Sequence, residues 1–303
     1  MKYLITGGAG FLGSHIAEAL HKENEVLIID NFSNGKEENI KGFNVEVFNM
    51  NVEDDLKDIL KGVDVVFHLA ADIAVNASFA DPIKTFKSNI LGTINLLESM
   101  RKHNVSKIVF SSSSAVYGEA QYKPIDENHP INCDSPYAIS KYDGEQFLRV
   151  YGLNYGIKSV ILRYFNLFGP RQSIDEEYGG VVAVFINRLL NNQPLIIYGT
   201  GEQSRDFIYV KDVAEANLVA ARFLENYNKN EPEIFNIGPE KEITINNLAR
   251  IMGGKDVKIT YKPERKGESM FSLSSCAKAK KMLNFSPQSP EKYLANWREW
   301  WGK

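Results

Sequence analysis

The 303-residue chain has little cysteine, no excess of basic residues and no long apolar run. Its two cysteines, Cys133 and Cys276, lie far apart without metal-ligand spacing, so we expect reduced thiols and no metal site. Lys and Arg number 35 against 38 Asp and Glu, which argues against a nucleic-acid partner. No segment approaches the roughly 20 apolar residues of a membrane span, and no secretory-signal pattern is present. We therefore expect a cytoplasmic protein without membrane contact.

Short β-branched runs alternate with helical patterns through the first half of the chain. The runs are residues 3–6, 26–30, 45–48, 63–67, 107–110 and 159–162. Near-continuous apolar strands separated by amphipathic helices are typical of a parallel sheet covered on both faces. The pattern predicts an α/β fold with a Rossmann-type, doubly wound parallel sheet.

The regular alternation stops after residue 165. The rest of the chain mixes short strands at 195–198, 207–210 and 234–237 with helices near 212–226, 244–252 and 290–300. We predict a dinucleotide-binding domain at 1–165 and a second, smaller α/β substrate-binding domain at 166–303. Some segments of the second part are expected to cross back to the first.

A glycine-rich turn at the N-terminus predicts a dinucleotide site. Gly7, Gly10 and Gly13 fall three residues apart between the first strand and the first helix, where backbone amides can meet a pyrophosphate. Asp30 ends the second strand about 20 residues later, where its carboxylate can accept hydrogen bonds from both ribose hydroxyls. A 2′-phosphate would be repelled there, so the pattern favours NAD over NADP.

A tyrosine and a lysine one helical turn apart predict a proton-transfer site. Ser135 and Pro136 are typical of a helix start, and Tyr137 and Lys141 then share one face of that helix. A phenol is a poor base at neutral pH, but the Lys141 ammonium and an oxidised nicotinamide could each lower its pKa by roughly one to three units. Tyr137 would then suit general base catalysis.

Ser113 follows a strand of the sheet, at the carboxyl end where ligands bind in doubly wound folds. Its hydroxyl could hydrogen-bond the reacting oxygen, although a run of four serines could equally be a polar loop. Taken with the glycine turn and Tyr137, this residue completes the pattern of a redox enzyme.

These residues resemble the extended short-chain dehydrogenase/reductase family, and within it the nucleotide-sugar 4-epimerases. The resemblance covers nearly the whole chain. Besides the glycine turn and Ser113, the matching segments are VFHLAA at 66–71, SNILGT at 88–93, YAISK at 137–141, RYFN at 163–166, GEQSRDF at 201–207 and RKGE at 265–268. The resemblance implies that NAD stays bound while the enzyme interconverts UDP-glucose and UDP-galactose, and also their N-acetyl counterparts, through a 4-keto sugar.

The resemblance also implies the residue roles. Catalysis would fall to Ser113, Tyr137 and Lys141. The residues expected at NAD are Gly7, Gly10, Phe11, Leu12, Gly13, Asp30, Asn31, Asn51, Val52, Leu69, Ala70, Ala71, Asn89, Ser111, Tyr137, Lys141 and Tyr164. Those expected at the UDP-sugar are Ser113, Tyr137, Asn166, Tyr198, Arg205, Arg265, Glu268 and Ser272, with the arginines on the diphosphate.

Departures from the family pattern are few. Asn51 and Val52 stand where Asp-Ile is usual beside adenine, Ile73 replaces a lysine found in some members, and Ser275 replaces a frequent aspartate. The histidines His15, His68 and His129 have no partner pattern in the sequence, and we interpret them as structural.

Two other functions stay open. A nucleotide-sugar 4,6-dehydratase or a UDP-glucuronate decarboxylase would carry carboxylates just after Ser113, where this chain has Ser114 and Ala115. A non-catalytic NAD-binding regulator would commonly lose the tyrosine or the lysine, and both are present.

The resemblance further bears on substrate range and assembly. Ser272 aligns with a position that is a bulky tyrosine in members restricted to plain hexoses, and a serine leaves room for a 2-acetamido group. Two long helices, near 82–102 and 136–155, pair in relatives, which implies a homodimer.

Overall fold

The computed structural model describes residues 1–174, 179–264 and 270–302. Its chain forms two compact units. The first consists of Met1–Val116, Cys133–Arg163 and Ala214–Phe235, and the second of Tyr117–Asn132, Tyr164–Val213 and Asn236–Lys303. The domain boundary predicted after residue 165 stays a prediction.

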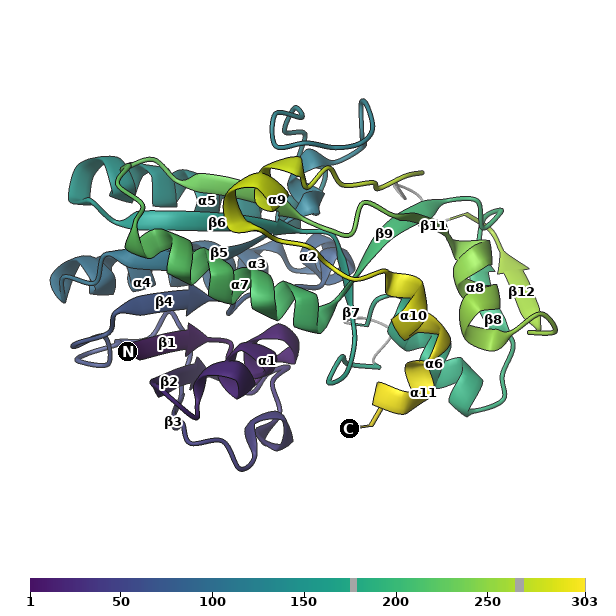
Figure 1. Cartoon of the computed structure of the whole chain (residues 1–303), viewed down its shortest axis with the longest axis horizontal. Helices are drawn as coiled ribbons and strands as arrows, with labels where there is room; N and C mark the ends of the chain where they lie inside the picture. Colours follow the sequence, from purple (N-terminus) through teal and green to yellow (C-terminus); the bar gives the residue numbers. More distant parts are fainter. Residues whose placement is uncertain (175–178, 265–269, 303) are drawn as a thin grey trace. The chain divides into compact units, whose positions relative to one another are not determined.

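A seven-stranded sheet forms the centre of the first unit, in the order β10-β6-β5-β4-β1-β2-β3 (Figure 1). Its strands are β1 (Lys2–Thr6), β2 (Glu25–Asp30), β3 (Glu46–Asn49), β4 (Val65–His68), β5 (Lys107–Ser113), β6 (Lys158–Tyr164) and β10 (Glu233–Ile237). β1 pairs in parallel with β2 and β4, β2 with β3, and β4 with β5. This order confirms the predicted doubly wound sheet, with its switch at β1.

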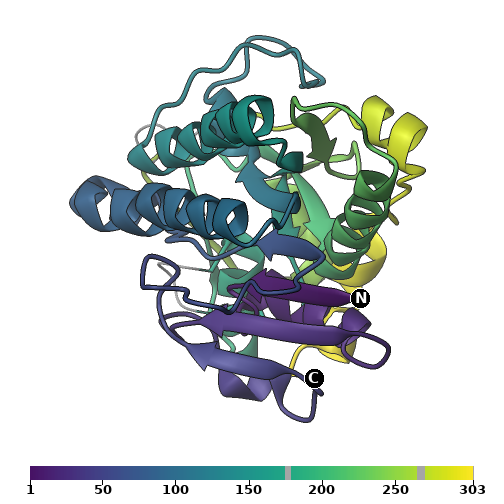
Figure 2. The same cartoon turned by 90° about the vertical axis from the view of Figure 1, so that its left-hand side faces the viewer.

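Helices cover both faces of this sheet. They are α1 (Phe11–Leu20), α2 (Val75–Ala80), α3 (Pro82–Phe86), α4 (Gly92–Lys102), α5 (Pro136–Tyr155) and α7 (Val210–Glu225). Figure 2 shows α4 and α5 side by side on one face and α7 on the other. The apolar strand residues pack beneath α4 and α5 in a core that includes Leu4, Leu97, Phe110 and Leu148. Residues 234–237, placed with the second domain by their sequence pattern, form β10 of this sheet and so cross back.

A single π-helical turn, η2 (Lys87–Leu91), joins α3 to α4. The family resemblance implies one long helix near 82–102, whereas the structure has three consecutive helical segments there. Such turns are rare and often occur at functional sites, because they redirect a side chain without ending the helix. Here the redirected side chain is Asn89.

The second unit is a smaller α/β unit, as predicted. A three-stranded sheet has the order β11-β9-β7, with β9 antiparallel to β11 and parallel to β7, and β8 pairs in parallel with β12. The strands are β7 (Asn166–Phe168), β8 (Leu195–Tyr198), β9 (Ser204–Tyr209), β11 (Glu242–Thr244) and β12 (Ile259–Lys262). The helices are α6 (Val181–Leu190), α8 (Ile245–Gly253), α9 (Ala277–Leu283), α10 (Pro290–Ala295) and α11 (Trp297–Trp300). None of the helices that the structure describes is both long and apolar enough to cross a membrane.

Candidate active site

The predicted dinucleotide turn links β1 to α1, and its glycines leave the backbone uncovered by side chains. Gly7 has φ +72°, and a Cβ there would lie 2.9 Å from the Ala70 amide nitrogen. Gly10 caps the start of α1 in an extended conformation, and a Cβ at Gly13 would overlap the Gly7 carbonyl oxygen. Side chains would fill this cradle, so the glycines fit the close approach of a pyrophosphate to a helix N-terminus.

Asp30 fastens this turn to the end of β2. Its Oδ2 accepts a hydrogen bond from the Ala9 N–H (2.9 Å), and its Oδ1 accepts one from the Phe32 N–H (2.8 Å). Burial raises the pKa of this carboxyl, and the two backbone bonds oppose that effect. Each oxygen keeps a second lone pair, so the arrangement is compatible with the predicted ribose contact, which stays a prediction.

Beside β2, Asn31 donates from Nδ2 to Asn51 Oδ1 at 2.8 Å, and Asn51 is held in turn by Asp54. Val52 is buried in the core of the first unit, where a Cβ on Gly92 would overlap it. The departure at 51–52 therefore preserves an ordered polar pair at 31 and 51, while Val52 packs inward.

His68, at the end of β4, organises the next stretch of predicted cofactor residues. Its Nδ1 accepts from the Thr6 hydroxyl (2.7 Å), which itself accepts from the Leu69 and Ala70 amides, and its Nε2 lies 2.9 Å from Thr93 Oγ1. Thr93 donates to the Asn89 carbonyl, so these partners place the proton of the neutral imidazole on Nε2. Burial, aided by the Lys141 charge, lowers the pKa of His68 to about 3. These contacts agree with a structural role.

Asn89 connects the end of β4 to α5. Its Oδ1 accepts from the Asp72 N–H (2.7 Å), and its Nδ2 donates to the Asp72 carbonyl (3.0 Å) and to Ser140 Oγ (2.9 Å). Ser140 then donates to the Tyr137 carbonyl at 2.8 Å. The Asn89 side chain is thus engaged on both sides by protein, an anchoring role towards Tyr137 that the sequence did not reveal. Its predicted contact with NAD stays a prediction.

The three predicted catalytic residues lie together in the first unit. α5 begins as predicted, with Ser135 Oγ accepting from the Ala138 N–H and Pro136 in the first turn, and this start places Tyr137 and Lys141 over the end of β5. The Ser113 hydroxyl lies beside the Tyr137 phenol and favours its ionised form, and Ser113 Oγ accepts from the Ala115 N–H at 3.1 Å.

Lys141 is buried beneath the phenol. Its Nζ donates to the Ser111 carbonyl at 3.0 Å and lies 6.0 Å from the centroid of the Tyr137 ring. It also lies 5.5 Å from the centroid of the Phe110 ring. The Ser111 backbone therefore contributes to the site by holding the ammonium, and the predicted contact of Ser111 with NAD stays a prediction.

The electrostatics of the site differ from the prediction in one respect. In the protein itself, burial raises the pKa of Tyr137, and the Ser113 hydrogen bond opposes this rise. Burial also lowers the pKa of Lys141 to about 8. The net change in the Tyr137 pKa of the protein alone is therefore upward, because desolvation disfavours the phenolate. The lowering predicted from Lys141 stays a prediction. The contribution predicted for the nicotinamide stays a prediction.

The predicted substrate residues that the structure describes belong to the second unit, apart from Ser113 and Tyr137. Asn166 lies in β7, and its Nδ2 donates to the Asp206 carbonyl at 3.4 Å; Tyr164, which is predicted at NAD, ends β6. Tyr198 ends β8, with the Lys262 ammonium 5.9 Å from its ring centroid. Arg205 lies in β9 and donates to the Ser204 carbonyl.

Of the remaining predicted residues, Arg265 and Glu268 lie outside the described part of the chain. Phe11 and Leu12 begin α1, and Ala71 follows Ala70 after β4. Within residues 1–174, 179–264 and 270–302, no group of three or more His, Cys, Asp or Glu side chains is placed to hold a metal ion.

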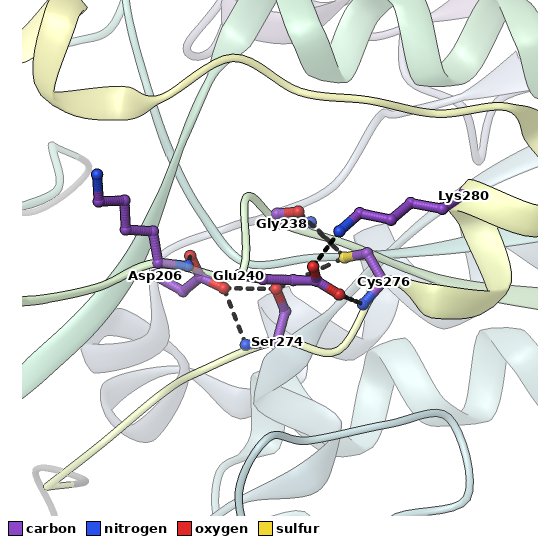
Figure 3. A network of polar contacts seen from close by, with 7 residues as sticks. Asp206, Gly238, Glu240, Ser274, Cys276 and Lys280 are labelled. Atoms are coloured by element: carbon purple, nitrogen blue, oxygen red, sulfur yellow. Dashed lines mark hydrogen bonds and ion pairs between the residues drawn. The ribbon is translucent and has the colours of Figure 1, made fainter.

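A buried polar network anchors the segment that carries Ser272 (Figure 3). The Asp206 carboxylate accepts from the Ser274 N–H at 2.8 Å, from the Ser274 hydroxyl, and from the Lys241 N–H at 2.9 Å. Cys276 exchanges hydrogen bonds with the Gly238 backbone, and Glu240 pairs with Lys280. Ser272 itself is half-buried two residues before this anchor.

A sheet of Rossmann type, with a glycine turn after β1 and with Ser113 next to the buried Tyr137 and Lys141, defines a dinucleotide-dependent enzyme of the short-chain dehydrogenase/reductase class. A family model described as "NAD dependent epimerase/dehydratase family" matches residues 3–238, and the chain belongs to this family. The match confirms the predicted family, the enzyme class and the dependence on NAD.

Relatives with assigned names are of two kinds. A protein of Methanocaldococcus jannaschii, provisionally named UDP-glucose 4-epimerase, is 46% identical over 94% of this chain and 93% of its own length. UDP-glucuronic acid decarboxylase 4 of Arabidopsis thaliana is 32% identical over 95% of this chain and 65% of its own length.

Solved structures with the same fold include epimerases. The UDP-N-acetylglucosamine 4-epimerase of Methanobrevibacter ruminantium, in complex with UDP-N-acetylmuramic acid, has TM-score 0.93 and 40% identity over 99% of this chain and 97% of that one. The UDP-glucose 4-epimerase of Thermotoga maritima, with UDP-glucose, has TM-score 0.90 and 38% identity over 97% and 96%. That of Thermus thermophilus, in complex with NAD, has TM-score 0.87 and 35% identity over 97% of each chain.

Proposed function

We propose that this enzyme is a UDP-hexose 4-epimerase that interconverts UDP-glucose and UDP-galactose, and also UDP-N-acetylglucosamine and UDP-N-acetylgalactosamine. The observation that carries the proposal is the buried Tyr137, which lies beside the Ser113 hydroxyl on one side and the buried Lys141 ammonium on the other. The names of the most similar relatives support the substrate class.

In this reaction Tyr137 accepts the proton of the sugar 4-hydroxyl and later returns it, while Ser113 hydrogen-bonds the same oxygen. Bound NAD supplies the acceptor and donor for the hydrogen at C4. Lys141 stays protonated and stabilises the phenolate, because its pKa of about 8 still lies above neutral pH. The 4-keto sugar rotates in the pocket and is then reduced on its other face, which gives the epimer.

Loose contacts to the hexose allow this rotation, and firm contacts to UDP retain the intermediate through remote binding energy. We assign the firm contacts to Asn166, Tyr198 and Arg205 of the second unit. Arg265 and Glu268 belong to the same proposed set. An arginine fork is well matched to a diphosphate.

Decarboxylase relatives favour a second candidate, because one of them is 32% identical to nearly the whole chain. Ser114 and Ala115 follow Ser113 here, so the positions after the serine offer no carboxylate for elimination. Release of carbon dioxide from UDP-glucuronate would nevertheless establish that activity.

One experiment tests these alternatives together. Purified protein is incubated separately with UDP-glucose deuterated at C4, UDP-N-acetylglucosamine and UDP-glucuronate, without added NAD, and the products are identified by NMR. We expect UDP-galactose that keeps deuterium at C4, and UDP-N-acetylgalactosamine. Carbon dioxide release, a dehydrated sugar or complete exchange of the C4 label with solvent would refute the proposal.

For the breadth of substrates, the proposal depends on the small side chain at Ser272. Ser272→Tyr should remove activity on UDP-N-acetylglucosamine and leave activity on UDP-glucose, because the phenol would occupy the space of the acetamido group. Ser275→Ala, in the same anchored segment, is the matched control. Equal losses on both sugars in Ser272→Tyr would contradict this steric explanation.

We further propose that the enzyme is a homodimer formed through α3, η2 and α5. Ile83 is 78% exposed and Leu91 55%, while Val150 and Leu153 of α5 are each 47% exposed. Val150, Leu153 and the half-exposed Ile139 recur at helical spacing, so they form one outward stripe. A second copy of the chain would cover such a face.

Sedimentation or light scattering tests this assembly. Leu153→Glu should convert the dimer to a monomer, whereas Met282→Glu, at an apolar residue of similar exposure on α9, should leave it dimeric. A wild-type monomer, or a dimer that survives Leu153→Glu, would contradict the proposal.

A further inference from the structure

Two residues at the end of β5 contact the Tyr137 phenol and the Lys141 ammonium of α5. The Ser111 carbonyl accepts from Lys141 Nζ, and the Ser113 hydroxyl lies beside the Tyr137 phenol. Their geometry therefore depends on how α5 is set along β5. A shift of α5 by one residue would rotate its side chains by about 100° and separate both pairs.

Ser112, between these two residues, makes a contact that the proposed reaction does not use. Its hydroxyl donates to Glu145 Oε1 at 2.6 Å. Glu145 lies on α5, one turn beyond Lys141 and two turns beyond Tyr137, so it shares their stripe of the helix. Ser112 thus joins the strand to the helix next to the catalytic contacts.

Arg163 completes this contact from the neighbouring strand β6. Its Nε donates to Glu145 Oε1 at 2.9 Å and its Nη2 to Glu145 Oε2 at 2.5 Å. The two side chains are 3% and 2% exposed. A forked pair of this kind fixes direction as well as distance, because both N–H groups of the guanidinium must meet the carboxylate plane.

A buried ion pair of this kind contributes more to geometry than to stability. Apolar residues of similar volume often stabilise a fold as well as such a pair does, but a slipped helix would leave two buried charges unpaired. Because Arg163 compensates the Glu145 charge, the pair also adds no net charge one turn from Lys141.

We propose that Ser112, Glu145 and Arg163 form a positioning clamp that fixes the register of α5 on β5 and so sets the contact between Tyr137 and Ser113. The inference rests on the proposed proton-transfer role of Tyr137. Ser112, Glu145 and Arg163 are positioning residues, since they act through the residues that touch the substrate.

The test compares Ser112→Ala with Ser112→Thr, which restores a hydroxyl. Ser159→Ala is the matched control, because Ser159 is a buried serine on β6 whose hydroxyl has no hydrogen-bond partner within the described residues. For the holoenzyme on UDP-glucose we expect Ser112→Ala to lower kcat about tenfold or more, with KM changed less than about threefold. Ser112→Thr should recover most of the loss, and Ser159→Ala should match wild type.

A second readout does not depend on catalysis. With tyrosine labelled with carbon-13 at Cζ, the Tyr137 signal is assigned by its loss in Tyr137→Phe and titrated with pH. The Tyr137 pKa, read from the midpoint, should rise in Ser112→Ala, because the Ser113 contact that favours the phenolate is weakened. It should return towards the wild-type value in Ser112→Thr.

The outcomes separate the two proposals. A wild-type protein without epimerase activity would refute the proposed function, while the titration would still decide the clamp. An unchanged midpoint with unchanged kcat in Ser112→Ala would overturn the clamp. So would equal losses in Ser112→Ala and Ser159→Ala. If Ser112→Ala failed to fold, the paired change Glu145→Met with Arg163→Met, which leaves no unpaired charge, would replace it with the same expected fall in kcat.

Discussion

Replacing Lys141 by methionine should stabilise the nucleotide-free protein while abolishing its activity. Burial lowers the pKa of this ammonium from 10.5 to about 8. At roughly 1.4 kcal/mol per pH unit, keeping the charge in the folded state at neutral pH costs about 3 kcal/mol. Loss of the bond from Lys141 Nζ to the Ser111 carbonyl offsets about 1 kcal/mol of the gain. We therefore expect Lys141→Met to raise the free energy of unfolding by about 2 kcal/mol at pH 7.

The pH dependence of this gain follows from the same pKa. Below pH 8 both the folded and the unfolded protein carry the proton, so the full cost is present. Between pH 8 and 10.5 the folded state releases the proton first, wild-type stability rises with pH, and the advantage of Lys141→Met disappears. Such a trade of stability for function is common at active sites.

Urea unfolding at pH 7 and pH 10 measures the effect, on protein freed of nucleotide because a bound ligand adds its own stabilisation. Lys102→Met, at an exposed lysine of α4, is the control and should change stability by less than about 0.5 kcal/mol. A Lys141→Met protein that is less stable than wild type at pH 7, or a gain that is the same at both pH values, would refute the reasoning.

Three further predictions concern the turn, the buried carboxyl and the thiols. Gly13→Ala should weaken NAD binding at least about tenfold in calorimetry, because its methyl would meet the Gly7 carbonyl. Burial raises the pKa of Asp206 from 3.8 to about 6, so its stabilising contribution is present below about pH 4 and is lost as pH rises through 6. The free energy of unfolding of the wild type should therefore fall by up to about 3 kcal/mol over this range, and that of Asp206→Asn should not. Burial raises the pKa of Cys133 to about 11 and of Cys276 to about 12, so native protein should resist iodoacetamide at pH 7.5 by mass spectrometry, and rapid labelling of Cys276 would contradict its burial.

Local chemistry explains what the sequence predicted well. The Ser135-Pro136 start of α5, the spacing of Tyr137 and Lys141, and the turn after β1 each depend on residues within one or two turns of chain. Such features follow from capping, helical period and the steric freedom of glycine, and the structure has them where the sequence placed them.

Contacts between distant parts of the chain could not be predicted in this way. His68 has no partner in its own neighbourhood of the sequence, and its bonds reach Thr6 and Thr93, 62 and 25 residues away. Glu145 and Arg163 each resemble an ordinary charged residue until the sheet order brings β5, β6 and α5 together. Nothing in the local pattern marks these residues.

The sign of the Tyr137 pKa change depends on a quantity that the sequence does not contain. From charges alone, the sequence predicts that a nearby ammonium lowers the pKa of the phenol. The structure buries both groups, and desolvation disfavours the charged form of each. The π turn at Asn89 is a similar case, because helix propensity does not distinguish one extra residue per turn.

The most direct test of the account is the rate of UDP-galactose formation from UDP-glucose by Tyr137→Phe, with Tyr155→Phe on the exposed end of the same helix as control. A phenol that moves the proton of the 4-hydroxyl predicts a fall in kcat of about 10²–10⁴-fold for Tyr137→Phe and wild-type turnover for Tyr155→Phe. Turnover by Tyr137→Phe within a few-fold of wild type would contradict the claim that this phenol carries the reaction.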